Sequence, residues 1–173
     1  MVRNIIPLGI EKTFEEDELI VSRTDVKGRI QYCNRKFISL SGYSEKELLG
    51  QPHSIVRHPE MPRCIFNLLW KYISEGEEIF AYVKNLCKGG EYYWVFANIT
   101  PTYDDGGQII GYHSNRRKPT REALKTIIEL YGLLLKEENK YQNRKEGMAH
   151  SLELLSDILA KKGMTYDEFI LSF

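Results

Sequence analysis

Two glycine-containing turns divide residues 79–117 into three long segments, and this division constrains the fold more than any other feature of the sequence. Lys88-Gly89-Gly90 separates the first two segments, and Asp104-Asp105-Gly106-Gly107 separates the second from the third. Turns of this kind join neighbouring antiparallel strands. The middle segment is rich in aromatic residues, as is typical of a strand at the centre of a half-buried sheet. We therefore expect three consecutive antiparallel strands here.

The segment before these strands alternates short strand and helix signals. Apolar residues alternate in 19–23 and 29–33 around a turn at 25–28, which predicts a β-hairpin. A helical pattern begins at Asn34, and Ser44 with Glu47 forms a capping-box pattern for the next short helix. A longer apolar helix follows Pro62. Together these elements predict an α+β domain over residues 19–118.

The two ends of the chain are expected to lie outside this domain. Residues 1–18 predict a loosely held segment with room for a short helix. Residues 119–173 predict amphipathic helices capped at Thr120 and Thr165. This C-terminal helical extension is too apolar on one side to stand alone. It must dock on the domain, form a homodimer with a second copy, or bind a partner helix.

Composition excludes several classes of protein. The 173 residues contain 24 acidic and 24 basic side chains, and this balance argues against nucleic acid or an anionic membrane as a partner. The first thirty residues lack a signal-peptide pattern, and no apolar run approaches the roughly 20 residues of a membrane span. We therefore expect a cytoplasmic protein. Its three cysteines are widely spaced and predict reduced, structural thiols and no metal site.

The loop before the long helix is the clearest candidate binding site. Prolines at 52, 59 and 62 restrict its backbone. His53, Arg57 and His58 supply polar donors within this restricted path, which favours a ligand-binding role. The next helix is apolar on two faces, and the face that carries Phe66 and Trp70 is expected to wall a pocket.

Several short motifs in this region resemble one known family. They are Ser41-Gly42-Tyr43, the run Glu47-Leu48-Leu49-Gly50-Gln51-Pro52-His53, the run Val56-Arg57-His58-Pro59-Glu60-Met61-Pro62, then Trp70, Val83-Lys84-Asn85 and Tyr93-Trp94. They resemble the PAS domain of the bacterial aerotaxis receptor (Aer) family over about residues 19–118. The resemblance implies an α+β PAS fold, with a five-stranded antiparallel sheet, short helices on one face and the C-terminal extension.

The resemblance also implies a function. Members of that family are FAD-binding redox sensors that steer motility. A stand-alone domain of this length resembles CetB, the cytoplasmic half of a two-protein energy-taxis system. Such a protein would signal in trans to a membrane-bound chemotaxis partner in energy taxis. The cofactor-binding residues implied are Asn34, His53, Arg57, His58, Glu60, Phe66, Trp70 and Asn85. Glu60 stands where the family has aspartate, which adds one methylene at that contact.

The residue types are compatible with a flavin without requiring it. Aromatic side chains can stack on the ring, and Arg57 can donate two hydrogen bonds to phosphates or ring carbonyl oxygens. Asn85 offers a donor and an acceptor to the ring edge, whereas no glycine-rich phosphate loop is present. Two other functions stay open: a haem-based gas or redox sensor with an axial ligand such as His53, His58 or His113, and a cofactor-free interaction module. No arrangement typical of an enzyme is present.

Overall fold

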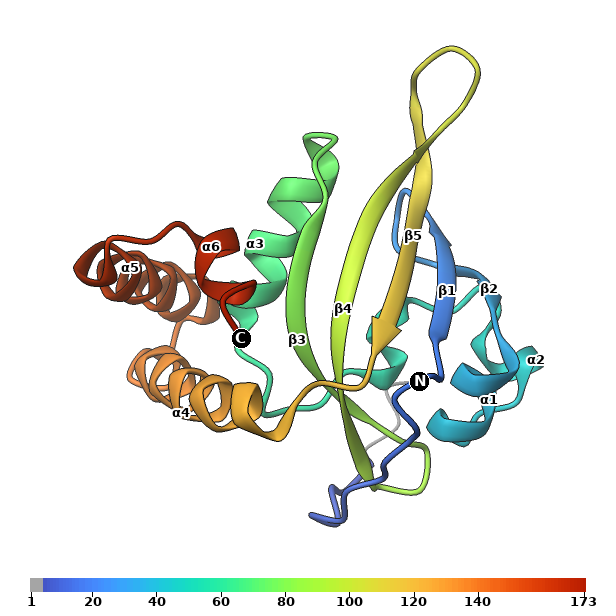
Figure 1. Cartoon of the computed structure of the whole chain (residues 1–173), viewed down its shortest axis with the longest axis horizontal. Helices are drawn as coiled ribbons and strands as arrows, with labels where there is room; N and C mark the ends of the chain where they lie inside the picture. Colours follow the sequence, from blue (N-terminus) through green and yellow to red (C-terminus); the bar gives the residue numbers. More distant parts are fainter. Residues whose placement is uncertain (1–4) are drawn as a thin grey trace.

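The protein contains a five-stranded antiparallel sheet with the strand order β2-β1-β5-β4-β3 (Figure 1). A computed structural model describes residues 5–173. Each predicted strand is present, and the predicted α+β PAS fold is confirmed. The strands are β1 Ile20–Asp25, β2 Ile30–Cys33, β3 Ile79–Leu86, β4 Tyr92–Tyr103 and β5 Ile109–Arg117.

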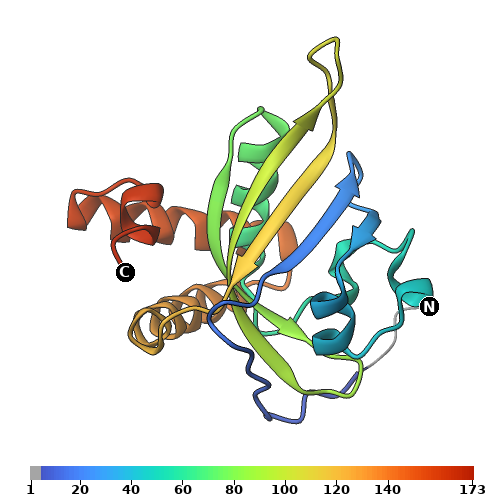
Figure 2. The ribbon, with the colours of Figure 1, turned by 45° about the vertical axis from the view of Figure 1, so that its right-hand side comes forward.

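The connection from β2 to β3 crosses one face of the sheet, because these two strands form its opposite edges (Figure 2). This connection holds helix α1 (Arg35–Ser41), helix α2 (Glu45–Leu48), the short 3-10 helix η1 (His53–Val56) and helix α3 (Arg63–Ser74). The topology therefore places the proline-containing loop and α3 over the centre of the sheet.

Local signals account for the ends of these helices. The Asn34 side chain accepts a hydrogen bond from the backbone N–H of Phe37 and so begins α1, and Gly42 ends it in the left-handed region with φ of 74°. The capping box predicted at Ser44 and Glu47 is present at the start of α2.

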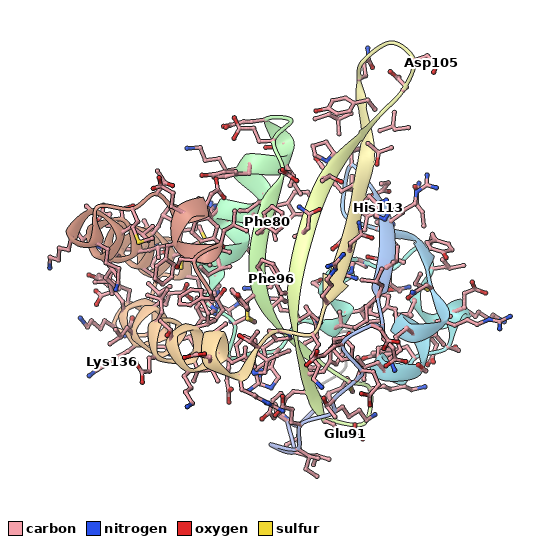
Figure 3. The ribbon with its side chains drawn as sticks, in the orientation of Figure 1. Phe80, Glu91, Phe96, Asp105, His113 and Lys136 are labelled. Carbon is pink, nitrogen blue, oxygen red and sulfur yellow. The ribbon has the colours of Figure 1, made fainter. Side chains whose placement is uncertain are left out.

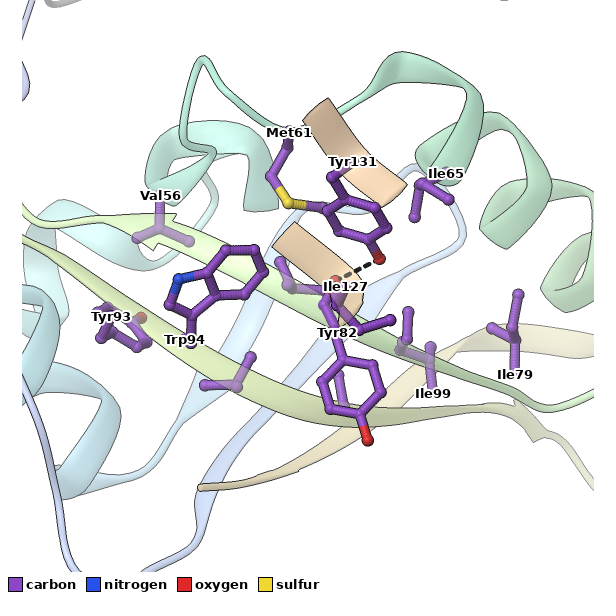
Figure 4. Packing of buried hydrophobic residues seen from close by; sticks show 14 of the residues in the cluster. Val56, Met61, Ile65, Ile79, Tyr82, Tyr93, Trp94, Ile99, Ile127 and Tyr131 are labelled. Carbon is purple, nitrogen blue, oxygen red and sulfur yellow. Dashed lines mark hydrogen bonds between the residues drawn. The ribbon is translucent and has the colours of Figure 1, made fainter. Parts of the chain in front are cut away.

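The C-terminal extension docks on the domain at its β3 edge (Figure 1). It consists of helices α4 (Arg121–Glu138), α5 (Arg144–Lys162) and α6 (Tyr166–Ile170). The buried Tyr131 hydroxyl of α4 donates to the backbone carbonyl of Tyr82 at 2.8 Å (Figure 4), and Ile127 of α4 is completely buried. Of the three arrangements that the sequence left open, the structure shows docking within one chain.

The described part of the N-terminal segment is held more firmly than the sequence predicted. Residues 5–18 contain no helix; they run extended along the β3–β4 turn, where the Leu8 N–H donates to the carbonyl of Gly90 at 2.8 Å. The Lys12 N–H donates to the carbonyl of Tyr92 at 2.7 Å, and Phe14 is buried in the core. The backbone pairing and this aromatic anchor hold the segment, and neither has a local sequence signature.

The two faces of the sheet carry different side chains, because successive residues of a strand point in opposite directions. Phe80 of β3 and Phe96 of β4 stack at 5.6 Å on the face away from α3 (Figure 3). The residues that alternate with them, such as Val83 and Ala97, point to the opposite face, which α3 covers, and are smaller. Room for a cavity is therefore expected only on the helix side.

Candidate functional site

A cavity of about 490 Å³ lies between the sheet and the helices that cover it. This volume falls within the roughly 300–1,000 Å³ of ligand-binding sites. Its walls are mainly apolar, formed by Phe66, Leu69, Trp70, Ile73, Val83, Ile99, Tyr112 and Met148.

Small side chains at the centre of the sheet make this space. Ala97 of β4 lies beside Arg116 of β5, and Ser114 of β5 lies beside Ser22 of β1. Branched or aromatic residues fill such positions in an ordinary half-buried sheet. Here alanine and serine occupy these positions and leave the volume open. The cavity therefore follows from the choice of small residues in the strands.

The interior end of the cavity is polar and positively charged. Arg116 is 5 % exposed, and one of its terminal nitrogens, Nη2, lies 2.8 Å from Ser22 Oγ and 2.7 Å from His53 Nε2. Burial first and the charge of Arg116 second lower the pKa of His53 to about 3, so this imidazole is neutral.

The opening of the cavity is also basic. Lys27, Arg57 and Arg63 belong to the cavity lining, where Lys27 is exposed and the two arginines are half-buried. The guanidinium carbon of Arg57 lies 4.0 Å from the centre of the Phe66 ring. Burial lowers the pKa of Arg57, and the neighbouring charge of Arg63 lowers it further. Neighbouring positive charges of this kind favour the binding of an anion.

The proline-containing loop owes its position to backbone contacts. Arg57 forms an isolated antiparallel bridge with Asn85 of β3, and Arg29 forms another with Pro52. The His53 N–H also donates to the carbonyl of Gly28 at 2.9 Å. These contacts fix the loop against both edges of the sheet, so that His53 and Arg57 face the cavity.

Trp70 covers the opening from α3. Its ring packs edge-on against Tyr112 with 5.6 Å between the ring centres, and its side chain remains 40 % exposed. The ring lies against Gly28 in the β1–β2 turn, where a Cβ atom would come within 2.9 Å of it. Glycine is needed here both for this approach and for its φ of +73°.

The structure brings together five of the eight residues that the sequence singled out as cofactor-binding. The residues that line the cavity are His53, Arg57, Phe66, Trp70 and Asn85.

The other three, Asn34, His58 and Glu60, lie outside the cavity lining. Asn34 is used by the fold, because its amide caps α1 and donates to the carbonyl of Leu19 at 2.8 Å. The ring of His58 is buried against Tyr92, and its Nδ1 accepts the N–H of Glu60 at 3.1 Å. The Glu60 carboxylate is paired with Lys84 at 2.5 Å and is exposed.

Polar residues on β1 and β5 line the cavity and were missed in the sequence. They are Ser22, Thr24, Ser114 and Arg116. The available signal was the alternation of each strand: Ser22 with Thr24, and Ser114 with Arg116, are spaced two residues apart and so share a face. Polar side chains at both inward positions of two paired strands indicate a lined cavity.

The C-terminal extension contributes to the site. Met148 of α5 forms part of the cavity wall. The buried Glu138 carboxylate at the end of α4 accepts the N–H of Cys64 in the first turn of α3 at 2.9 Å. Ser151 of α5 donates to the sulfur of Cys64 at 3.2 Å. The extension therefore touches the helix that walls the cavity.

Three further findings concern membrane spans, metal ligands and cysteines. No helix within residues 5–173 is both long enough and apolar enough to cross a membrane. In the same range, no three histidine, cysteine or acidic side chains cluster as metal ligands would, and Cys33, Cys64 and Cys87 are free and buried.

Comparison with known proteins agrees with this architecture. A protein-family model described as the PAS fold matches residues 30–116. The chain belongs to the PAS family. The domain is 40% identical over 119 residues to the Aerotaxis receptor of Escherichia coli, a match that covers 69% of this chain and 23% of the receptor. The predicted likeness to the aerotaxis receptor is thereby confirmed.

Other PAS relatives are more distant. The chain is 27% identical over 103 residues to the Nitrogen fixation regulatory protein of Klebsiella pneumoniae, covering 60% of this chain and 21% of that protein. This PAS chain thus spans less than a quarter of the length of either curated relative. The light-state structure of the blue-light photoreceptor Aureochrome1 LOV matches the fold with a TM-score of 0.57 and 24% identity, over 64% of this chain and 88% of that one.

Proposed function

We propose that this chain is a non-catalytic, FAD-binding PAS redox sensor that signals in trans to a membrane-bound chemotaxis partner. The observation that carries the proposal is the cavity of about 490 Å³ with apolar walls, a basic opening and a buried polar end. Its polarity fits the three parts of a flavin nucleotide: phosphates, an apolar ring face and a ring edge with carbonyl oxygens.

The residues present can hold each of these parts. Lys27, Arg57 and Arg63 at the opening suit a pyrophosphate. Phe66 and Trp70 offer aromatic surface to the ring, and Asn85 offers an amide to its edge. When bound, the flavin would supply reversible electron transfer, and these residues would hold its ring out of water.

The structure gives the haem alternative little support. Within residues 5–173, His53 is the single histidine that lines the cavity. Its Nε2 already lies 2.7 Å from a terminal nitrogen of Arg116 and 3.2 Å from Ser22 Oγ. An axial ligand must have a free nitrogen directed at the metal, and this one faces a guanidinium.

Binding tests the proposal directly. Full-length protein, freed of any bound cofactor, is titrated with FAD while the quenching of flavin fluorescence is recorded. Trp70→Ala and Arg57→Ala are expected to weaken FAD binding at least tenfold, because they remove ring cover and a phosphate contact. Lys136→Ala alters an exposed residue of α4 (Figure 3) and serves as the control. Full FAD affinity in both site variants would refute the site assignment.

Signalling in trans draws support from the docked extension. Because Met148 lines the cavity and Glu138 binds the first turn of α3, a change around the ligand reaches α4 and α5 without an intermediate layer. A coupling of about 1–3 kcal/mol is typical between two such sites. Hydrogen exchange of the α4 amides in oxidised and reduced protein measures this coupling. Identical exchange in both states would contradict it.

A further inference from the structure

Arg116 is a buried cation whose hydrogen-bonding capacity is only partly used. It lies near the end of β5, between Ile20 of β1 and Ala97 of β4. One terminal nitrogen, Nη2, donates to Ser22 Oγ at 2.8 Å and to His53 Nε2 at 2.7 Å. The other, Nη1, is buried and has no hydrogen-bond partner in the structure.

The charge of Arg116 also lacks a counter-ion. Within residues 5–173, no carboxylate forms an ion pair with it. Burial lowers the pKa of Arg116 to about 10, so the guanidinium remains charged at neutral pH. An unpaired charge in a protein interior is strongly unfavourable, which indicates that a further group completes this site.

His53 cannot supply the missing negative charge. A guanidinium has no lone pair to accept a proton, so His53 Nε2 accepts from Arg116 and the imidazole carries its proton on Nδ1. Protonating it would place two cations 2.7 Å apart. The neutral imidazole and Ser22 therefore orient Arg116 without neutralising it.

A second unpaired polar atom lies on the same face of β5. Ser114 is 6 % exposed, and its hydroxyl is buried without a hydrogen-bond partner. Residues two apart in a strand point to the same side, and both Ser114 and Arg116 line the cavity. Two buried donors directed into one cavity define a site for ligand acceptor atoms.

We propose that Arg116 and Ser114 bind the carbonyl-bearing edge of the ligand ring, and that the Arg116 charge favours the reduced, more electron-rich form of that ring. The proposal rests on the flavin function above and deepens it by assigning two residues and an orientation. The ring edge lies at the buried end beside Arg116, and the phosphates lie at the opening beside Arg57. A charged group near the polar edge is one of the means by which a protein tunes a flavin.

A series of truncated ligands separates the two ends of the cavity. Apo-protein is titrated with riboflavin, FMN and FAD, which share the ring and differ in phosphates. Arg116→Gln is expected to weaken all three by the same factor of at least tenfold, because it removes a charged hydrogen bond to the ring. Arg57→Ala is expected to weaken FAD and FMN more than riboflavin. Arg117→Gln, an exposed neighbour on β5, is the control.

The reduction potential gives a second readout. The midpoint potential of the bound flavin is measured by titration with dithionite beside a reference dye. If Arg116→Gln weakens binding of the reduced ring tenfold more than that of the oxidised ring, a two-electron midpoint falls by about 30 mV. Arg116→Lys keeps the charge, so its flavin midpoint potential is expected to stay close to the wild-type value. Its affinity for riboflavin is expected to fall, because the hydrogen bond of the guanidinium to the ring is lost.

The possible results distinguish the inference from the function on which it rests. Wild-type protein that binds no flavin would refute both. Wild-type protein that binds flavin, with Arg116→Gln within twofold of it for riboflavin and unchanged in potential, would refute only the inference. If Arg116→Gln does not fold, Arg116→Lys and Ser114→Ala decide: unchanged riboflavin affinity in both variants overturns the proposal, and a loss in both supports it.

Discussion

Replacing Glu138 tests whether the C-terminal extension is an integral part of the domain. The buried carboxylate accepts the N–H of Cys64 at 2.9 Å, across 74 residues of sequence. This N–H lies in the first turn of α3 and has no partner within its own helix. A hydrogen bond to a charged group contributes about 1.5–3 kcal/mol, and a negative charge at a helix N-terminus adds about 0.3–1 kcal/mol.

Glu138→Ala is therefore expected to lower the free energy of unfolding by about 2–4 kcal/mol. Glu138→Gln keeps an acceptor oxygen and is expected to lose about 1 kcal/mol, the part that depends on charge. Urea unfolding followed by circular dichroism measures both values. Glu129→Ala, an exposed change on the same helix, is the control and should stay within about 0.5 kcal/mol of wild type. A loss below about 0.5 kcal/mol for Glu138→Ala would refute the bond as a stabilising contact.

Three further predictions follow from the geometry around the cavity. Gly28→Ala is expected to weaken FAD binding by displacing Trp70, whereas Gly50→Ala has a similar positive φ with open space around it and should cost only stability; equal FAD affinity in the two variants would contradict this role. The pKa of His53 is lowered to about 3 in the folded protein, so below about pH 6.5 the unfolded chain binds a proton that the folded protein does not. The free energy of unfolding should therefore decrease as the pH is lowered, by about 2 kcal/mol between pH 7 and pH 5. In urea unfolding, His53→Gln should lose this part of the dependence of the unfolding free energy on pH. An unchanged pH dependence would contradict the prediction. Asn34→Ala removes a helix cap and should lower the free energy of unfolding by about 1–2 kcal/mol in the same assay, while FAD affinity stays the same. A loss of FAD affinity without a loss of stability would show instead that Asn34 contributes to FAD binding.

The elements of the fold were predictable because their signals are local. The glycine-containing turns, the Ser44 capping box and the Thr165 capping box all act within a few residues, and the structure shows each of them. Periodicity likewise predicted that the face of α3 with Phe66 and Trp70 would wall a pocket, and both residues line the cavity.

The contacts that complete the site were not predictable, because they join distant parts of the chain. Arg116 meets Ser22 across 94 residues, and nothing near either residue records that pairing. His58 shares a polar loop with Arg57, but only the folded backbone shows that one ring turns towards Tyr92 while the other side chain lines the cavity. Sequence therefore located the loop that lines the cavity, and the strand register located the buried charge.

One absorption spectrum of the full chain purified from its native host tests the central claim most directly. The account predicts flavin absorption bands, and FAD as the molecule released when the protein is denatured. Protein obtained without a bound cofactor is first incubated with FAD, FMN and haem. A Soret band, or no bound chromophore after that incubation, would contradict the account.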